Sequence, residues 1–438
     1  MSAIAQYCAW MGLHVSGSDR LLGSPSVAAV QQGLSSLGCR LCGQDGSGID
    51  SRVDALVVST AIEPGNPDMV AAQAARIPVF HRSDVLAALV ACHRTIAIAG
   101  TSGKSTVTAM VWEFLHSCGR DPSLVSGANL LRLEERGYVG NAYKGTSGIL
   151  VIEADESDGT LVKYHPDTSV FLNISKDHKP VVETMELFRT LAAQSATVVT
   201  NADDAMLGAI QPAVTFGAGS GAGVRPDSVA SLTPQVRFTR AGRTFELPLP
   251  GAHNLSNCLA ALAVCEMAGC NAKDLTAAVA GYKGVMRRFS VKRLDNGMIV
   301  IDDYAHNPEK IRAALTTAQG FSDRVIAIFQ PHGYGPTRFL KDDLADMFST
   351  VLRQSDVLFM LPIYYAGGTA QKDISSGDIA SLINKRGRTA SVLSDKEECV
   401  STVRSIASPG NAILVMGARD PSLSSLATTI ASALADPR

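Results

Sequence analysis

The sequence predicts an α/β fold in which doubly wound sheets are divided among three domains. At roughly 150 residues per domain, the 438-residue chain has room for about three of them. Along its whole length, short apolar runs rich in β-branched residues alternate with longer helical segments, which is the pattern of doubly wound α/β proteins. Hydrophobic residues make up 46% of the chain and charged residues 18%, a composition that supports a sizeable core and excludes extensive disorder.

Changes in this pattern divide the chain into residues 1–92, 93–286 and 287–438. In the first block we expect strands at residues 13–15, 55–58 and 79–80 and a helix at 83–91. In the second block we expect strands at 94–99, 148–152, 169–172 and 197–200, a β-rich patch at 236–249, and helices at 107–115 and 254–268. In the third block we expect strands at 298–301, 325–329, 357–361 and 413–416.

Composition also excludes several classes of protein. Lysine and arginine total 39 against 41 acidic residues, a net charge of −2, and aromatic residues are only 5%. A nucleic-acid-binding protein usually has a basic surface and aromatic stacking residues, so we expect no nucleic-acid partner. No apolar run reaches the roughly 18 residues that cross a bilayer, and the nine cysteines do not form a disulfide framework. We therefore expect a cytoplasmic protein without a membrane span, present as a monomer or homodimer.

A glycine-containing turn between a strand and a helix is the strongest local signal. It consists of Gly100, Thr101, Ser102, Gly103, Lys104, Ser105 and Thr106. In this context, backbone N–H groups can face a phosphate at the helix N-terminus, where the helix dipole favours an anion. Lys104 can then reach the terminal phosphates, and the Ser105 hydroxyl can bind Mg²⁺. The spacing is two residues tighter than in the usual P-loop motif, so an ordinary turn with a surface lysine is the alternative.

Acidic residues follow the predicted strand at 148–152. Glu153 lies closest to the strand end and is the best candidate ligand for Mg²⁺, which prefers carboxylate oxygens and keeps phosphates and waters in its other positions. A solvated acidic loop is the alternative. The next predicted strand, 169–172, ends near His178, a histidine that on its own would usually be incidental.

These motifs, taken in order with others, resemble those of the Mur ligases, the ATP-dependent ligases of peptidoglycan synthesis. The resemblance covers nearly the whole chain and rests on residues 100–105, 153–158, 173–178, 201–204, 250–257, 287–289 and 302–308. Residues 16–19, 59–62, 66–67 and 329–332 are similar to the branch of the family that uses L-alanine. The resemblance implies a Rossmann-like UDP-sugar-binding domain at 1–92, a central P-loop ATPase domain at 93–286 and a Rossmann-like amino-acid-side domain at 287–438.

The resemblance also implies an activity and roles for individual residues. ATP would phosphorylate the carboxylate of UDP-N-acetylmuramate, and the amine of a small amino acid would attack the acyl phosphate to form an amide. Ser105 and Glu153 would hold one Mg²⁺ and His178 a second, with Lys104 on the phosphates. His253, Asn254 and Asn257 would face the adenine, while Arg288, Asp303 and His306 would reach ATP from the third domain. The implied substrate-side residues are Ser18, Asp19, Ser59, Thr60, Tyr304, His332 and Arg338.

The sequence departs from the family in two places. Met1 aligns with the end of the family's first glycine-rich loop, so the first strand is missing and we expect that the chain starts inside a longer coding sequence. Gly333 and Pro336 stand where two arginines would pair with the amino-acid carboxylate, and neither can replace a guanidinium. Arg338 lies nearby and could substitute in part.

Three alternatives remain beside an L-alanine ligase. One is a divergent ligase of the same family with another amino acid or peptide as acceptor. A second is a P-loop kinase or ATPase, which would release a stable phosphorylated product or phosphate rather than an amide. The third is a non-catalytic binding protein derived from a ligase.

Overall fold

The computed structural model describes residues 1–24, 27–177, 179–365 and 371–435. The chain forms two compact units. The first comprises Met1–Ala230, Arg237–Pro248 and Asn254–Met286, and the second comprises Ser231–Val236, Leu249–His253 and Arg287–Arg438. Among the described residues, no helix combines the length and the apolar character that a membrane span requires.

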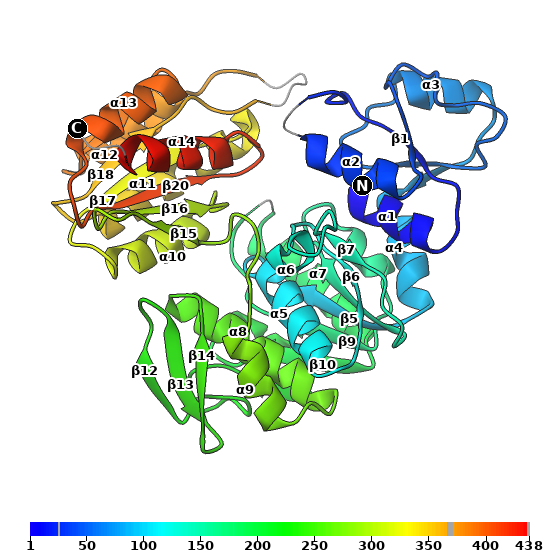
Figure 1. Cartoon of the computed structure of the whole chain (residues 1–438), viewed down its shortest axis with the longest axis horizontal. Helices are drawn as coiled ribbons and strands as arrows, with labels where there is room; N and C mark the ends of the chain where they lie inside the picture. The colour runs from blue at the N-terminus through cyan, green and yellow to red at the C-terminus, as the bar shows by residue number, and fades with distance from the viewer. Residues whose placement is uncertain (25–26, 178, 366–370, 436–438) are drawn as a thin grey trace. The chain divides into compact units, whose positions relative to one another are not determined.

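The N-terminal part of the first unit contains two pairs of parallel strands instead of one Rossmann-like sheet (Figure 1). β1 (Ser16–Ser18) pairs with β2 (Arg40–Cys42), and β3 (Leu56–Val58) pairs with β4 (Val79–His81). Its helices are α1 (Ser2–Trp10), α2 (Ala28–Ser36), α3 (Pro67–Ala74) and α4 (Arg82–Ala91).

The strand expected at residues 13–15 is wrong, because β1 begins only at Ser16. The backbone N–H of Leu13 donates to the carbonyl of Cys8 at 3.1 Å, which closes the last turn of α1. The Leu13 side chain is 59% exposed. Leu13 therefore closes the end of the helix, and the strand begins three residues later than expected, at Ser16.

A seven-stranded sheet forms the centre of the first unit, in the order β11-β10-β9-β5-β8-β6-β7. Its strands are β5 (Arg94–Ala99), β6 (Ser123–Val125), β7 (Ala142–Tyr143), β8 (Ile149–Ala154), β9 (Thr168–Phe171), β10 (Thr197–Asn201) and β11 (Val214–Phe216). All neighbours are parallel except β6 and β7. Thr95 to Ala99 are all buried, as expected for a central strand covered on both faces.

Helices cover this sheet, and a small separate sheet follows it in the chain (Figure 1). The helices are α5 (Lys104–Ser117), α6 (Leu131–Glu134), α7 (Val181–Ala193), α8 (Ala252–Met267) and α9 (Ala272–Ala280). The small sheet consists of β12 (Ser228–Ser231), β13 (Val236–Arg240) and β14 (Arg243–Leu247). It confirms the β-rich patch that the sequence predicts there.

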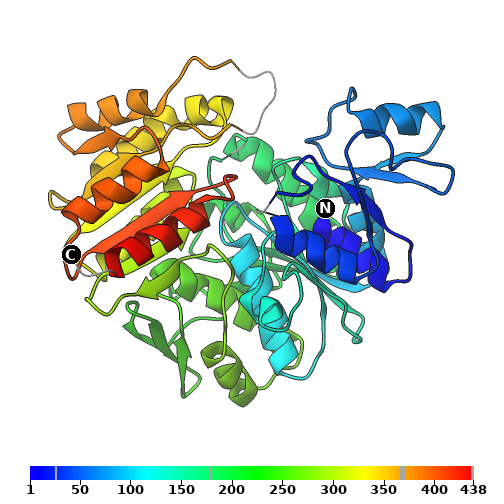
Figure 2. The same cartoon turned by 45° about the horizontal axis from the view of Figure 1, so that its top comes forward.

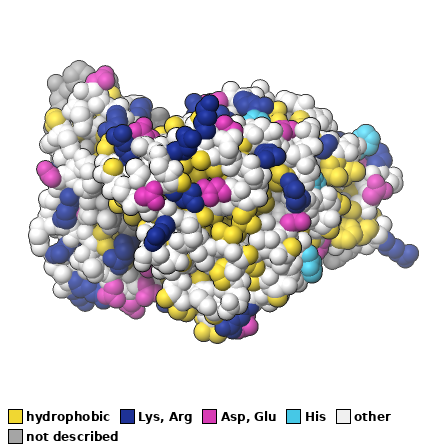
Figure 3. All heavy atoms as spheres, turned by 90° about the horizontal axis from the view of Figure 1, so that it is seen from below, with side chains coloured by type: hydrophobic (Ala, Val, Ile, Leu, Met, Phe, Trp, Pro, Cys, Tyr) yellow, Lys and Arg dark blue, Asp and Glu magenta, His cyan; other side chains and the backbone are white. Residues whose placement is uncertain are grey.

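On the face drawn in Figure 3, basic and acidic side chains are interspersed.

The second unit contains a six-stranded sheet in the order β15-β16-β20-β17-β18-β19. The strands are β15 (Ser290–Arg293), β16 (Ile299–Asp303), β17 (Val325–Gln330), β18 (Val357–Met360), β19 (Ala390–Val392) and β20 (Ala412–Gly417). Its helices are α10 (Pro308–Gln319), α11 (Tyr334–Val351), α12 (Ser376–Lys385), α13 (Lys396–Ile406) and α14 (Leu423–Ala435).

Alternate residues of β17 divide this sheet's core into two layers. Ala327 and Phe329 belong to the cluster packed against α10, α11 and α12, whereas Ile326 and Ile328 belong to the cluster packed against α13 and α14. The helices therefore cover both faces, and α13 and α14 lie side by side on one of them (Figures 1 and 2). This arrangement confirms the doubly wound α/β fold class in the C-terminal domain.

Candidate active site

Three neighbouring strands of the central sheet bring the predicted phosphate and metal residues to one edge. β5 lies between β8 and β9, and its last residue, Ala99, is in register with Ala154 and Phe171. The glycine turn, the acidic run and the segment at 173–177 follow these three strands directly. Ligands of open α/β sheets bind at this carboxyl edge.

Two glycines of the turn have conformations and neighbours that exclude a side chain. Gly100 has φ +146°, and a Cβ there would lie 2.9 Å from the Cβ of Leu172. Gly103 has φ +89° and caps α5, and a Cβ there would lie 2.6 Å from Oδ1 of Asn257. The turn thus depends on glycine at both positions.

Asn173 fastens the turn to the end of β9. Its Oδ1 accepts a hydrogen bond from the Ser102 backbone N–H at 2.8 Å, and its Nδ2 donates to the Ser102 carbonyl at 3.0 Å. The Ser175 backbone N–H donates to Thr101 Oγ1 at 3.0 Å. The buried Thr106 follows in the first turn of α5. The backbone that would face a phosphate is therefore held in place by side chains of the neighbouring strand end.

Replacing Gly103 by alanine is expected to weaken ATP binding about tenfold, equivalent to about 1.4 kcal/mol, because the new Cβ must displace Asn257. Gly119→Ala is the matched control. Gly119 also has a positive φ, +74°, but a Cβ there meets nothing within 4 Å. Isothermal titration with ATP checks the prediction, and equal affinities for the two variants would contradict it.

Lys104 is held within the site by two carboxylates. Its Nζ lies 2.6 Å from Glu156 Oε2 and 3.5 Å from Asp155 Oδ1, and it donates to the Gly100 carbonyl at 2.9 Å. Burial alone would lower the pKa of Lys104, but the charges of Glu156 and Asp155 outweigh it and raise the pKa above its usual value. The Lys104 side chain is only 14% exposed, so the alternative of a surface lysine is wrong.

Glu153 lies at the end of β8 with hydrogen-bond donors around its carboxylate. Oε2 accepts from Ser105 Oγ at 3.0 Å, and Oε1 accepts from Ser126 Oγ and from the Gly127 backbone N–H, both at 2.7 Å. The two predicted Mg²⁺ ligands, Ser105 and Glu153, are therefore adjacent. His178, the third predicted ligand, lies outside the described residues.

The first turns of α8 bring two asparagines to the glycine turn. Asn254 and Asn257 are 3% and 8% exposed, and Asn257 Nδ2 donates to Asn254 Oδ1 at 3.2 Å. Gly103 packs against Asn257. His253 belongs to the other compact unit, where it lies beside Gly251, and burial lowers its pKa to about 4.

In the second unit, several predicted residues gather beyond the end of β16. The guanidinium of Arg288 lies 5.0 Å from the centre of the Tyr304 ring. His306 bonds to the Tyr304 carbonyl through Nδ1 at 2.9 Å, and its ring centre lies 5.3 Å from that of His332. Asp303 accepts from the backbone N–H groups of Phe289 and Ala305, both at 2.7 Å. Burial raises the pKa of Asp303 to about 6, against the opposing charge of Arg288.

Arg338 is paired within the protein, with the carboxylate of Asp373 and, at 3.2 Å, with the carbonyl of Gln371. Gly333 caps α11 with φ +67°, so an arginine at this position would be strained. Pro336 lies in the first turn of the same helix. A Cβ at position 333 would lie 3.3 Å from its Cδ atom. The sequence therefore departs from the family pattern at a position where the start of α11 favours glycine.

The predicted substrate residues of the N-terminal part lie at the ends of two different strand pairs. Ser18 ends β1 and donates to the carboxylate of Asp68, and Asp19 accepts from the Leu21 backbone N–H at 2.8 Å. Ser59 and Thr60 follow β3. The structure does not bring these two sets into one sheet.

Comparison with known proteins agrees with this geometry. Residues 1–94 match the catalytic domain of the Mur ligase family, residues 98–265 match the Mur ligase middle domain, and residues 287–419 match the glutamate ligase domain. The UDP-N-acetylmuramate–L-alanine ligase of Synechococcus sp. strain RCC307 is 34% identical over 96% of this chain and 91% of its own length. The chain belongs to the Mur ligase family. A second L-alanine ligase, from Pelotomaculum thermopropionicum, is 35% identical over 96% of this chain and 92% of its own.

Solved structures of Mur ligases share the fold. The UDP-N-acetylmuramate–alanine ligase of Thermotoga maritima superimposes with a TM-score of 0.79 at 24% identity, covering 99% of this chain and 96% of its own. A murein peptide ligase of Psychrobacter arcticus gives a TM-score of 0.70 at 21% identity, covering 100% and 97%. The three-domain α/β architecture is thus that of a Mur ligase, a family of carbon–nitrogen ligases.

Sequence reasoning missed two residues of this Mur ligase's site. Glu156, which pairs with Lys104, belongs to the acidic segment at residues 153–158. The sequence of this segment does not show which of its carboxylates faces the lysine. Ser126 follows β6, and no motif marks its hydroxyl as a partner of Glu153. A polar residue directly after a short buried strand was the only available signal.

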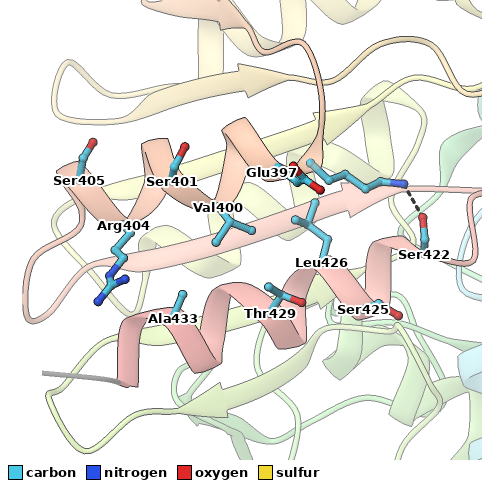
Figure 4. Close-up of a pocket in the computed structure, with 11 residues that line it drawn as sticks. Glu397, Val400, Ser401, Arg404, Ser405, Ser422, Ser425, Leu426, Thr429 and Ala433 are labelled. Carbon is cyan, nitrogen blue, oxygen red and sulfur yellow. Dashed lines mark hydrogen bonds between the residues drawn. The ribbon is translucent and has the colours of Figure 1, made fainter. Parts of the chain in front are cut away.

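A groove of about 940 Å³ between α13 and α14 is a separate feature of the C-terminal unit (Figure 4). Val400 and Leu426 point into it from the two helices. Lys396 at its end donates to Asp420 at 2.6 Å and bonds to Ser422, so its charge is already compensated. None of the predicted site residues lines this groove.

Proposed function

We propose that this Mur ligase joins the amino group of L-alanine to the carboxylate of UDP-N-acetylmuramate through an acyl phosphate, with ATP as the phosphoryl donor, in cytoplasmic peptidoglycan synthesis. The observation that carries the proposal is the adjacency of the glycine turn, Lys104 and the Ser105–Glu153 pair at one sheet edge. The names of relatives that match 96% of the chain support the choice of substrates.

The three sequence blocks would divide the substrates among them. Residues 1–92 would bind the UDP-sugar, with Ser18, Asp19, Ser59 and Thr60 at the strand ends that face it. Residues 93–286 would bind ATP, and residues 287–438 would bind the amino acid. Tyr304, His332 and Arg338 would lie on the amino-acid side, while Arg288, Asp303 and His306 would reach the nucleotide.

Phosphoryl transfer needs positioning and charge neutralisation more than covalent chemistry. The backbone N–H groups of the turn and the Nζ of Lys104 would bind the terminal phosphates of ATP. To do so, Lys104 exchanges part of its contact with Glu156 for contacts with phosphate oxygens. Until ATP binds, the ion pair with Glu156 keeps the Lys104 ammonium charged and in position. Lys104 then stabilises the negative charge that develops as the phosphoryl group moves to the muramyl carboxylate.

Glu153 at the end of β8 and Ser105 in the first turn of α5 fit a magnesium ion. Ser105 Oγ and the Glu153 carboxylate are hard oxygen donors 3.0 Å apart. No group of three or more His, Cys, Asp or Glu residues suited to a metal occurs in the described part of the chain, as expected if phosphates and waters complete the shell. When bound, Mg²⁺ neutralises charge on the phosphates. We assign His178 to a second ion by the family resemblance.

The adenine would lie near the start of α8. Asparagine amides can donate to N7 and accept from N6 of adenine. Asn257 packs on the glycine turn and bonds to Asn254, which places both amides beside the phosphate site. His253 precedes them in the chain, and its lowered pKa of about 4 keeps the ring neutral at pH 7.

The proposal is tested by measuring ADP release from ATP and Mg²⁺ with UDP-N-acetylmuramate and a panel of acceptors: L-alanine, glycine, L-serine and a short peptide. We expect release only when both the sugar and an amino acid are present, with L-alanine preferred. Because Gly333 and Pro336 offer no guanidinium, we expect L-alanine to show a high Michaelis constant, on the order of ~1 mM. Amino-acid-independent turnover would instead indicate a kinase or ATPase, and no turnover a binding protein.

A further inference from the structure

Three parallel strands of the C-terminal sheet end at the same edge. β20 lies between β16 and β17, and its last residue, Gly417, is in register with Gln330 of β17. Arg419 follows β20, two residues beyond its end. We propose that the Arg419 guanidinium binds the α-carboxylate of the incoming amino acid, in place of the two arginines whose positions Gly333 and Pro336 occupy. This inference rests on the proposed ligase function and names the residue that recognises its acceptor.

The predicted amino-acid-side residues lie on both sides of Arg419. Tyr304 follows β16, whose last residue, Asp303, is in register with Met416 of β20. The backbone N–H of Arg419 donates to the Tyr304 hydroxyl at 3.3 Å. His332 follows the end of β17, the neighbour of β20 on its other side. Because ligands of open α/β sheets bind at the carboxyl edge, the strand order places Arg419 where the proposed function needs the amino acid.

The backbone of Arg419 is held in a left-handed conformation. Its φ is +70°, a region that residues with a side chain adopt uncommonly, and Arg287 and Phe289 share it with φ +58° and +54°. Arg287 fixes the turn, because Nη2 donates to the Gly417 carbonyl at 2.7 Å and Nη1 donates to the Asp420 carbonyl at 3.4 Å. Residues in such conformations persist where the surrounding structure holds them, and they cluster at functional sites.

The Arg419 guanidinium is available to a ligand. The residue is exposed, and among the residues that the structure describes no hydrogen bond or ion pair engages its side chain. The neighbouring carboxylate of Asp420 is already compensated, because it accepts from Lys396 Nζ at 2.6 Å and from the Ser422 hydroxyl at 2.6 Å. The charge of Arg419 is therefore not neutralised by the acid beside it.

Two other arginines near this edge are already engaged. Arg338 pairs with the carboxylate of Asp373, and Arg287 pairs with Asp302 at 3.2 Å. Each would have to exchange an ion pair for the substrate, whereas Arg419 would not. A guanidinium can bind both oxygens of a carboxylate through two parallel N–H bonds, a geometry that a lysine does not reproduce. Because one guanidinium stands in for two, the high Michaelis constant expected for L-alanine still holds.

The test compares L-alanine with L-alaninamide, which has the same amine and methyl group but a neutral amide in place of the carboxylate. Acceptor-dependent ADP release is measured with wild type and Arg419→Gly at saturating ATP, Mg²⁺ and UDP-N-acetylmuramate. We expect Arg419→Gly to raise the Michaelis constant for L-alanine at least about tenfold, the scale of losing one charged hydrogen bond. The use of L-alaninamide and the Michaelis constants for ATP and the UDP-sugar should not change.

The glycine variant separates binding from folding. Glycine adopts a φ near +70° without strain, so Arg419→Gly should melt close to or above the wild-type temperature. Arg76→Gly is the matched control, because Arg76 is also exposed and left-handed, with φ +58°, but it precedes β4 at the amino end of that strand. The control should leave every Michaelis constant unchanged. Arg419→Lys keeps the charge without the planar fork, so its Michaelis constant for L-alanine should be intermediate.

Failure of Arg419 in this role is distinguishable from failure of the ligase function. An unchanged Michaelis constant for L-alanine in Arg419→Gly, or an equal loss with L-alaninamide, would overturn the role of Arg419 and leave the ligase function intact. A higher Michaelis constant for ATP alone would also overturn it, because Arg419 would then serve the nucleotide. If wild type released no ADP in response to any amino acid, the ligase function would fail, and this assignment with it.

Discussion

Replacing Lys104 by alanine is expected to lower ATP turnover at least ~10²-fold, the scale of removing one preorganised charge from a transition state. The reason is that Lys104 is the cation held over the glycine turn, 2.6 Å from Glu156 and 2.9 Å from the Gly100 carbonyl. Phosphate release in the presence of UDP-N-acetylmuramate and L-alanine measures the effect.

Two companion variants separate chemistry from folding. Removing Lys104 leaves the buried Glu156 carboxylate unpaired, which costs about 3 kcal/mol of stability, so Lys104→Ala with Glu156→Gln should regain stability without regaining turnover. Lys163→Ala is the matched control, because Lys163 also pairs with a carboxylate at 2.6 Å, that of Asp84, but at an exposed position. Turnover of Lys104→Ala within a few-fold of wild type would show that the turn is structural.

The second large effect is expected for Glu153→Gln, which should raise the Mg²⁺ concentration needed for half-maximal turnover at least tenfold, or about 1.4 kcal/mol. Glutamine keeps the shape and can still accept from Ser126 and Gly127, but it loses the charge that a divalent cation requires. A magnesium titration at saturating ATP measures this change.

The control for this variant is Glu186→Gln, which neutralises an exposed glutamate paired with Arg189 in the same unit. It should leave the titration unchanged. If Glu153→Gln gave the same magnesium titration as the control, Glu153 would not be a metal ligand.

The long inner strands of the central and C-terminal sheets were predictable because each is a continuous apolar run, whereas the short strand β6 and the edge strands β7, β11, β15 and β19 were missed. β5, β8, β17 and β20 are buried on both faces, so nearly every residue is hydrophobic and the runs stand out. The N-terminal part was less predictable. Its strands are three residues long, and the apolar Leu13 bonds to the end of α1 instead of lying in a strand, a distinction that hydropathy cannot make.

The candidate site was likewise predictable only in part. Gly103 and Ser105 could be placed because a strand, a glycine turn and a helix are local in sequence. The pairing of Lys104 with Glu156, and of Glu153 with Ser126, could not be predicted, because it depends on which strands become neighbours in the sheet. The engagement of Arg338 by Asp373 is likewise a tertiary contact between residues 35 positions apart.

The central claim is that an acyl phosphate forms on the muramyl carboxylate. It is tested most directly with UDP-N-acetylmuramate whose carboxylate carries ¹⁸O, incubated with the enzyme, ATP, Mg²⁺ and L-alanine. If the carboxylate attacks the terminal phosphate of ATP and the amine then displaces phosphate, one labelled oxygen leaves with the phosphate. We expect mass spectrometry to find one ¹⁸O in each phosphate released from the doubly labelled carboxylate and one in the amide product. Phosphate free of ¹⁸O, released alongside an unchanged sugar, would contradict the account.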